Sequence, residues 1–526
     1  MAARSPKRAL AALLLLCAVS AGTPSPTSTS ALLARISAAT GAAAFARAGG
    51  LVVEEQSAGR PRRLLFGVRG ELRVGDLLGF DGDLRWHVDS RRGGFVPVNH
   101  RLFEQAAIPL WVRSGWWLDR KSGFAIAMLP ALSDAHAIAL RLTGPEGLAS
   151  ATLYIERATS LPMRLVVPTD HGDQITTFSD YRRIFGIDLA FRVDEAGRAQ
   201  GTTVSVRPMA AGDAGFEPPP LADFAFDRSV PADIPIRQGS PFSPGVPPHL
   251  FVKPEIDGAE RGWFLFDSGA DLGLIDAKVA DSAGMKKLEP ATLVGTDGNP
   301  RAGAMRKGAT FRIGRLSFRD PLFLATDFSS SNAPLFEPRA GVIGYDVFAR
   351  AIVEFVGHGE RIAICDPRTY RLPAGGSWQK LFFLDSTPAV RARYGDKAPG
   401  RYGLFQIDTG SPTSVGFYPE AVAREHLLDG RPTRAIEARG GGGLFTTHAG
   451  RLGWFEFGGR RFEQLPAEFR TGGIGRSGGT GLIGRDLLSR FTTVFDYPNR
   501  RIGFVPLGVG PTPSGCSASG TAPPLP

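Results

Sequence analysis

Cysteine is scarce in this sequence, with three residues among 526: Cys17, Cys365 and Cys516. A scaffold built on several disulfides is therefore excluded, and a hydrophobic core must supply the stability. If an N-terminal segment that contains Cys17 is removed, Cys365 and Cys516 remain. The sequence leaves open whether these two form a bridge.

Long apolar runs are also lacking. Beyond the first residues, no stretch approaches the roughly 20 apolar residues that a transmembrane helix needs, so we expect no transmembrane segment in the mature chain. The first residues place Arg4, Lys7 and Arg8 before the apolar run 9–19, and small residues follow it. This pattern is typical of a secretory signal peptide, which we predict at residues 1–21. It favours a secreted or periplasmic location.

Several motifs of other protein classes are missing. The sequence contains no HExxH metal motif and no GxSxG nucleophile motif. Residues 479–484 spell GxGxxG, but no dinucleotide-binding βαβ unit surrounds them. The net charge of +10 comes from scattered arginines, and no nucleic-acid-binding module is recognisable. We therefore expect no metal, no cofactor and no nucleic-acid partner.

What the sequence does contain is turn residues, with 66 Gly and 41 Pro. They favour a mainly β protein with short strands, and one helix is expected within residues 121–146. Composition shifts suggest the following division of the chain. After the signal peptide we predict a disordered leader at 22–34, an N-terminal β domain at 35–212, a linker at 213–234, one lobe at 235–371, a second lobe at 372–506 and a disordered tail at 507–526.

An internal repeat links the two predicted lobes. Phe264–Gly269 and Phe405–Gly410 each run from an apolar strand into Asp, a hydroxyl residue and Gly. Further along, Gly341–Asp346 matches Gly481–Asp486. The distance from Asp to the second Gly of that later motif is 77 residues in one lobe and 76 in the other. Such agreement indicates a duplicated unit.

Three further landmarks keep the same register. Phe355 and Phe495 each lie 11 residues beyond the second Gly, and Arg361 and Arg501 each lie 17 beyond it. A tight hairpin turn is expected at 313–316 in one lobe and at 457–460 in the other.

The repeated motif carries chemistry because it supplies two acids. Peptide hydrolysis without a covalent intermediate needs a base for the water and an acid for the amide, and two adjacent carboxyls provide both. Carboxylates roughly 3 Å apart cannot both ionise, so such a pair holds one shared proton. We predict that Asp267 and Asp408 are this pair.

At these residues the sequence resembles the pepsin and retropepsin superfamily, specifically bacterial secreted aspartyl proteases with both lobes in one chain. The resemblance covers about residues 230–506. It implies a bilobal, double-β aspartic protease fold that acts on a polypeptide substrate. By position it implies catalytic roles for Asp267 and Asp408 and roles in shaping or supporting the two loops for the following residues: Ser268, Thr409, Gly269, Gly410, Gly344 and Gly484.

The sequence departs from the family in two ways. The glycine-rich segments 295–299 and 440–444 stand about where flaps would cover a substrate, but neither contains the Tyr of pepsin-like flaps. Each lobe, of about 140 residues, is also shorter than a typical pepsin lobe, which favours lobes like fused retropepsin protomers. A duplicated chain has no need to dimerise, so a monomer is expected.

The N-terminal domain resembles the periplasmic lipoprotein carriers in the segments 80–86, 153–156 and 177–182. The resemblance implies a curved, open antiparallel sheet with a helix, and a lipid or peptide ligand. The alternative is that Trp111, Trp116 and Trp117 are plain core or rim aromatics. For the whole chain, the alternative to an aspartic endopeptidase is a catalytically inactive peptide- or lipid-binding protein of the cell envelope.

Overall fold

The protein is described from a computed structural model. It covers the following residues: 29–92, 94–195, 201–213, 215–221, 223–239, 248–329, 339–356, 361–440, 443–507 and 514–516. The predicted signal peptide, residues 22–28 of the predicted leader and most of the predicted tail lie outside these described residues.

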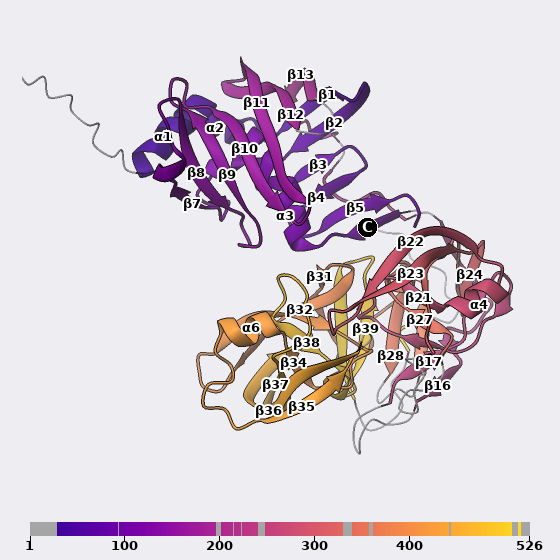
Figure 1. Cartoon of the computed structure of the whole chain (residues 1–526). Helices are drawn as coiled ribbons and strands as arrows, with labels where there is room; N and C mark the ends of the chain where they lie inside the picture. Colours follow the sequence, from indigo (N-terminus) through magenta and orange to yellow (C-terminus); the bar gives the residue numbers. More distant parts are fainter. Residues whose placement is uncertain are drawn as a thin grey trace, which may run out of the picture.

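The N-terminal domain is one antiparallel sheet whose 13 strands follow the order β6-β5-β4-β3-β2-β1-β13-β12-β11-β10-β9-β8-β7 (Figure 1). Nearly every neighbour in the sheet is also a neighbour in sequence, so short turns suffice to connect them. The strands are β1 Leu51–Ser57, β2 Arg60–Phe66, β3 Leu72–Val74, β4 Leu78–Phe80, β5 Arg85–Asp89, β6 Gly94–Pro97, β7 Ala125–Met128, β8 Ala137–Thr143, β9 Ser150–Glu156, β10 Pro162–Thr169, β11 Gly172–Ile184, β12 Ile187–Glu195 and β13 Gly201–Pro208.

The helix of this domain lies elsewhere than predicted. Residues 121–146 form β7, a short 3-10 helix at Pro130–Leu132 and β8, so a helix there is wrong. Cross-strand pairing of β8 with β9 prevails over the Ala and Leu content of the segment. The helix is α3, His100–Ser114, which Asn99 caps by accepting from the Leu102 amide.

Three tryptophans in or directly after α3 belong to the core of the domain. Trp111, Trp116 and Trp117 are 3%, 7% and 1% exposed and pack with the sheet residues around α3. The alternative prediction, that these three side chains are core aromatics, is therefore confirmed.

The predicted leader is wrong for residues 29–34, because helix α1 spans Thr29–Thr40 and is followed by α2, Ala42–Arg47. Leu32 and Ile36, one helical turn apart, are buried against the N-terminal core. Their apolar contact orders a segment whose composition alone suggested disorder.

Two eight-stranded sheets follow, and they repeat the same strand order. The first runs β16-β17-β20-β27-β21-β26-β23-β22 and the second runs β31-β32-β33-β38-β34-β37-β36-β35. Position by position, each strand of one sheet has a counterpart in the other, so the sequence repeat is a structural repeat.

The first set is β16 Ile236–Gln238, β17 Leu250–Val252, β20 Phe264–Phe266, β21 Gly273–Asp276, β22 Lys286–Val294, β23 Pro300–Lys307, β26 Leu322–Thr326 and β27 Gly341–Ile343. The second set is β31 Phe382–Leu384, β32 Thr387–Gly395, β33 Arg401–Ile407, β34 Val415–Phe417, β35 Arg434–Arg439, β36 Leu444–Phe457, β37 Arg460–Arg470 and β38 Gly481–Ile483. The helices α4 Ala277–Ser282, α5 Tyr345–Phe348, α6 Pro419–Arg424 and α7 Arg485–Leu488 also come in matching pairs.

A six-stranded sheet, β15-β29-β28-β39-β40-β30, takes three strands from each half. Its strands are β15 Asp233–Ile234, β28 Ile352–Val356, β29 Arg361–Cys365, β30 Ser377–Lys380, β39 Phe491–Asp496 and β40 Arg501–Pro506. The landmark rings Phe355 and Phe495 meet at its centre, with ring centroids 5.5 Å apart. A mainly β architecture is confirmed.

The turns predicted between short strands are present. Residues 314–315 join β24 Thr310–Ile313 to β25 Leu316–Arg319, and residues 458–459 join β36 to β37. Gly314, Gly458 and Gly459 have positive φ angles of 52°, 57° and 73°, which glycine adopts without strain. A five-stranded sheet of the first half, β14-β25-β24-β18-β19, adds β14 Phe224–Phe226, β18 Glu255–Ile256 and β19 Ala259–Glu260.

Two segments that the sequence predicted to be irregular, the linker and the tail, contain strands or a disulfide. The predicted linker 213–234 includes β14 and β15, which pair with β25 and β29, so those residues belong to the duplicated unit. In the predicted tail, Cys516 forms a disulfide with Cys365, which answers the open question of their pairing. Within the described part of the chain, no helix is long and apolar enough to cross a membrane.

Candidate active site

Two equivalent loops bring the predicted acids together. Asp267 follows β20 and Asp408 follows β33, and each of these strands pairs in parallel with the strand of the later repeat motif, β27 or β38. The backbone amide of Asp267 donates to the Ile343 carbonyl at 3.0 Å, and the amide of Asp408 donates to the Ile483 carbonyl at 2.9 Å. These bonds fix each acid at the end of its strand.

Crossed hydrogen bonds join the loops. The Ser268 amide donates to Thr409 Oγ1 at 2.9 Å, and the Thr409 amide donates to Ser268 Oγ at 3.1 Å. Each hydroxyl also donates across the seam, Ser268 Oγ to the Ile407 carbonyl at 2.8 Å and Thr409 Oγ1 to the Phe266 carbonyl at 3.1 Å. Both side chains are buried, so these bonds do not compete with water. The two halves are thereby locked at the acids.

The glycines allow the acids to face each other. The Gly269 amide donates to Asp267 Oδ1 at 2.7 Å, and the Gly410 amide donates to Asp408 Oδ1 at 2.9 Å. A Cβ on Gly269 would lie 2.7 Å from Asp408 Oδ1, and a Cβ on Gly410 would lie 2.5 Å from the Asp267 carboxyl carbon. Each carboxyl therefore lies over the glycine of the opposite loop, where a side chain has no room.

Gly344 and Gly484 lie directly beneath the loops. A Cβ on Gly344 would come within 2.5 Å of the Ala270 carbonyl oxygen, and one on Gly484 within 2.4 Å of the Thr413 carbonyl oxygen. The next residue in each half, Tyr345 or Arg485, donates its amide to a carbonyl of the loop above it. The glycines of the GxGxxG spelling thus serve close backbone packing.

The surroundings of the two carboxyls raise the pKa of both acids. Removal from water, and next the charge of Asp408, raise the pKa of Asp267, and the hydrogen bond between the two carboxyls adds to this rise. Removal from water also raises the pKa of Asp408, but the charges of Arg470 and Arg476 oppose that rise. Both side chains keep some exposure to solvent. The arrangement favours a proton on Asp267 and a negative charge on Asp408.

Two glycine-rich hairpins meet at their tips. The turn 295–299 between β22 and β23 and the turn 440–443 between β35 and β36 correspond to the two glycine-rich segments. A Cβ on Gly440 would lie 2.3 Å from Thr296 Oγ1, and one on Gly443 would lie 2.6 Å from Asp297 Oδ2. The tips therefore touch, with glycine at the contact, and neither contains a tyrosine.

Sequence reasoning missed the basic residues around the pair. His249, directly before β17, makes a 2.7 Å hydrogen bond from Nε2 to the Gly410 carbonyl. Arg476 donates to the Gly269 carbonyl at 3.2 Å, so the glycine of each Asp-hydroxyl-Gly loop has a side-chain partner. Neither residue belongs to the repeated motif, and no sequence signal connects it with the acids.

His249 gives the site a second pH sensitivity. It is 7% exposed, and burial lowers its pKa from 6.5 to about 4, with Arg485 and Arg339 acting in the same direction. Because the folded pKa lies below the unfolded one, its contribution to stability is present above pH 6.5 and is lost as the pH falls toward 4. At pH 4 we expect the free energy of unfolding of wild type to have fallen, relative to a His249→Gln variant, by an amount on the order of 3 kcal/mol.

Urea unfolding of both proteins between pH 7 and pH 4 measures this difference. His426→Gln is the matched control, since that ring is exposed and distant in sequence. Parallel pH dependences of wild type and His249→Gln would contradict a buried, neutral histidine.

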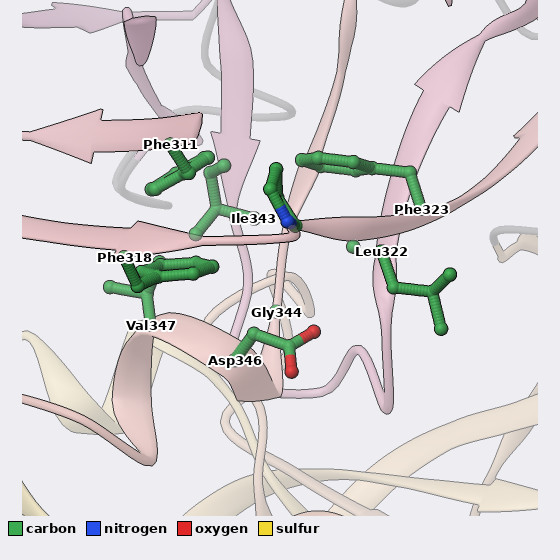
Figure 2. Close-up of a pocket in the computed structure, with 10 residues that line it drawn as sticks. Phe311, Phe318, Leu322, Phe323, Ile343, Gly344, Asp346 and Val347 are labelled. Atoms are coloured by element: carbon green, nitrogen blue, oxygen red, sulfur yellow. The ribbon is translucent and has the colours of Figure 1, made fainter. Parts of the chain in front are cut away.

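A pocket beside Gly344 offers no second site. Figure 2 shows it lined by aromatic and aliphatic side chains, among them Phe311, Phe318 and Phe323. Asp346 is the acid among its lining residues, and neither Asp267 nor Asp408 lines it. Among the described residues, no group of three or more His, Cys, Asp or Glu is arranged to hold a metal ion.

Comparison with known proteins bears on the first of the two acids. Residues 252–347 match the aspartyl protease family model. The matched range contains Asp267 and Gly344 and ends before the second loop. Over these residues the chain is similar to aspartyl proteases, a family of hydrolases.

Among solved structures, the chain is similar to the crystal structure of aspartic proteinase from Irpex lacteus. The sequences are 14% identical, the match covers 55% of this chain and 99% of that chain, and the TM-score is 0.33. No curated protein matches the chain.

Proposed function

We propose that the protein is an aspartic-type endopeptidase in which Asp267 and Asp408 hydrolyse peptide bonds. The observation that carries this proposal is the pair of carboxyls, each lying over the glycine of the opposite loop, on two interlocked loops. Asp408, whose rise in pKa is opposed by the charges of Arg470 and Arg476, takes a proton from water, and the water oxygen adds to the carbonyl carbon. Asp267 donates its proton to the amide nitrogen as the carbon–nitrogen bond breaks, so that the two acids end with the proton exchanged between them. The pair and a water molecule suffice, so the proposed reaction uses no metal and no cofactor.

The remaining predicted site residues support the acids. Ser268 and Thr409 hold the loops in register, because each hydroxyl bonds to the opposite strand. Gly269 and Gly410 leave room for the opposite carboxyl, and Gly344 and Gly484 let the loops settle on the strands below. We propose these six residues as the scaffold of a bilobal, pepsin- or retropepsin-like site.

We further propose a secreted or periplasmic protein of bacterial type that acts as a monomer. The signal-peptide pattern supports the location, and the supply of both acids by one chain supports the monomer. The likeness of the N-terminal domain to lipoprotein carriers supports a lipid or peptide ligand there. Such a ligand would not use Trp111, Trp116 or Trp117, because the core already buries them.

A peptide library tests the enzymatic proposal. We expect the purified full chain to cleave library peptides in the range pH 3–8 and a statine-type inhibitor, which mimics the tetrahedral intermediate, to stop the cleavage. Mass spectrometry of the products identifies the cut bonds. Absence of cleavage at every pH, combined with saturable binding of a peptide or lipid, would instead establish an inactive binding protein.

A further inference from the structure

The N-terminal domain contacts the rest of the protein at several places, and one group of these contacts lies beside the acid pair. Arg92 donates to the Asp271 carbonyl at 2.9 Å, four residues after Asp267, and Asn99 Nδ2 donates to Asp385 Oδ1 at 2.7 Å. His100 Nε2 bonds to the Phe383 carbonyl at 2.8 Å. In Figure 1 the β5 region is the part of this domain that lies next to the catalytic strands.

These contacts reach two parts that would form the floor and the roof of a groove if a substrate of the proposed peptidase lies across the acids. The floor here is the catalytic loop that carries Asp267, and the roof is the hairpin β22–β23. Arg91, at the turn between β5 and β6, pairs with Glu289 on β22 at 2.5 Å, while its neighbour Arg92 reaches the floor at Asp271. The β5–β6 turn therefore spans from roof to floor.

A segment of the second half contacts the same two parts, the β22–β23 hairpin and the loop of Asp267. The Ile474 amide donates to the Thr296 carbonyl at the roof tip at 2.9 Å. Two residues on, Arg476 contacts the floor, where it pairs with Asp271 and donates to the Gly269 carbonyl at 3.2 Å. Arg476 also pairs with Asp385 at 3.1 Å.

The N-terminal domain and the segment 474–478 of the second half also contact each other. Gly478 packs against the His100 ring, where a Cβ would lie 3.3 Å from Nδ1. Asp385 receives Asn99 from the N-terminal domain and Arg476 from the second half. We use the name end wall for the cluster of Arg476, Asp271 and Asp385. It includes the three N-terminal residues that contact this region, which are Arg92, Asn99 and His100.

The opposite side of the acid pair is built differently. There the Gly410 carbonyl is bonded by His249, which comes from the catalytic unit itself. Every N-terminal contact described above lies on the Asp271 side. The groove is thus asymmetric although the two halves repeat.

We propose that the end wall closes the groove on the Asp271 side, so that a substrate cannot extend past the wall in that direction. This inference rests on the proposed peptidase function and defines its substrate class. The substrates are polypeptides cut at internal bonds a few residues from one chain end. An extended chain that continued past the wall would need the space between roof and floor that Arg476 and the β5–β6 turn occupy.

Extended peptides test the proposal in the full-length protein. A short peptide that the protein cleaves is lengthened by about six Gly and Ser residues, roughly 20 Å of extended chain, at its N-terminus or at its C-terminus. We expect one extension to leave kcat/KM nearly unchanged and the other to lower it by about tenfold or more. Tolerance of both extensions, or of neither, would overturn the proposal.

A variant that loosens the wall sharpens the test. Arg92→Ala combined with Asn99→Asp removes one bond to Asp271 and places like charges at Asp385, while the new carboxylate still caps α3. We expect the cleavage rate of the disfavoured extended peptide, relative to that of the short one, to rise several-fold. Arg101→Ala, an exposed change next to Asn99, is the control and should leave both rates unchanged.

Failure of this inference and failure of the peptidase proposal give different results. If no peptide of any length is cleaved, the peptidase function itself falls. If the short peptide is cleaved but the double variant leaves the ratio of the two extended substrates as in wild type, the end wall has no role in selecting substrates and the proposal is overturned.

Discussion

Asp267→Asn and Asp408→Asn are each expected to lower kcat/KM for peptide cleavage by at least about 100-fold, because either change removes the proton exchange on which the reaction depends. The amide keeps the shape of the carboxyl and can still accept from the Gly269 or Gly410 amide. Folding should therefore be preserved. Single-turnover assays on a library-derived peptide measure the loss.

The same variants are also expected to change how the stability of the folded protein depends on pH. The pKa of each acid is raised in the folded protein, so burial of the pair contributes stability below about pH 3.8 and opposes folding as the pH rises above it. We expect the thermal midpoint of either Asn variant to gain on wild type as the pH rises from 4 to 8.

Asp429→Asn is the matched control, since Asp429 is 77% exposed, and it should change neither activity nor the pH trend. Near-normal turnover by either dyad variant would rule out the proposed pair.

Gly269→Ala and Gly410→Ala should be nearly as damaging as loss of an acid. The added methyl would lie 2.7 Å from Asp408 Oδ1 in the first case and 2.5 Å from the Asp267 carboxyl carbon in the second. The carboxyl must move to make room, and a displacement of about 1 Å in an active site costs on the order of 100-fold in rate. We expect that loss in kcat with smaller changes in KM.

Gly212→Ala provides the control for this pair, because a Cβ there has nothing within 4 Å. Circular dichroism establishes that the variants fold. An Ala variant with wild-type kcat would show that the carboxyls do not lie over the opposite glycines during catalysis.

Much of the candidate site was readable from the sequence because the chain contains it twice. The Asp-hydroxyl-Gly motifs predicted Asp267 and Asp408 as one pair, and the constant spacing to Gly344 and Gly484 predicted paired strands beneath them. The structure brings these residues together as that pattern requires. The landmark Phe355 and Phe495 likewise meet across the repeat.

Amino-acid composition predicted local structure less well in segments where contacts of a few side chains or strands determine the fold. Leu32 and Ile36 convert part of a predicted leader into helix, and pairing of β8 with β9 overrides a helical composition. In both cases the deciding partner is remote in sequence, so local preference could not reveal it.

The sequence by itself determined the mainly β class, the duplication and the identity of the two acids, because a repeated motif carries its own register. Only the tertiary structure decided which side chains surround the acids and how the N-terminal domain is placed. His249 and Arg476 reach the catalytic loops from 161 and 207 residues away, and Asn99 meets Asp385 across 286. Contacts of that kind depend on the packing of whole sheets, and no local pattern encodes them.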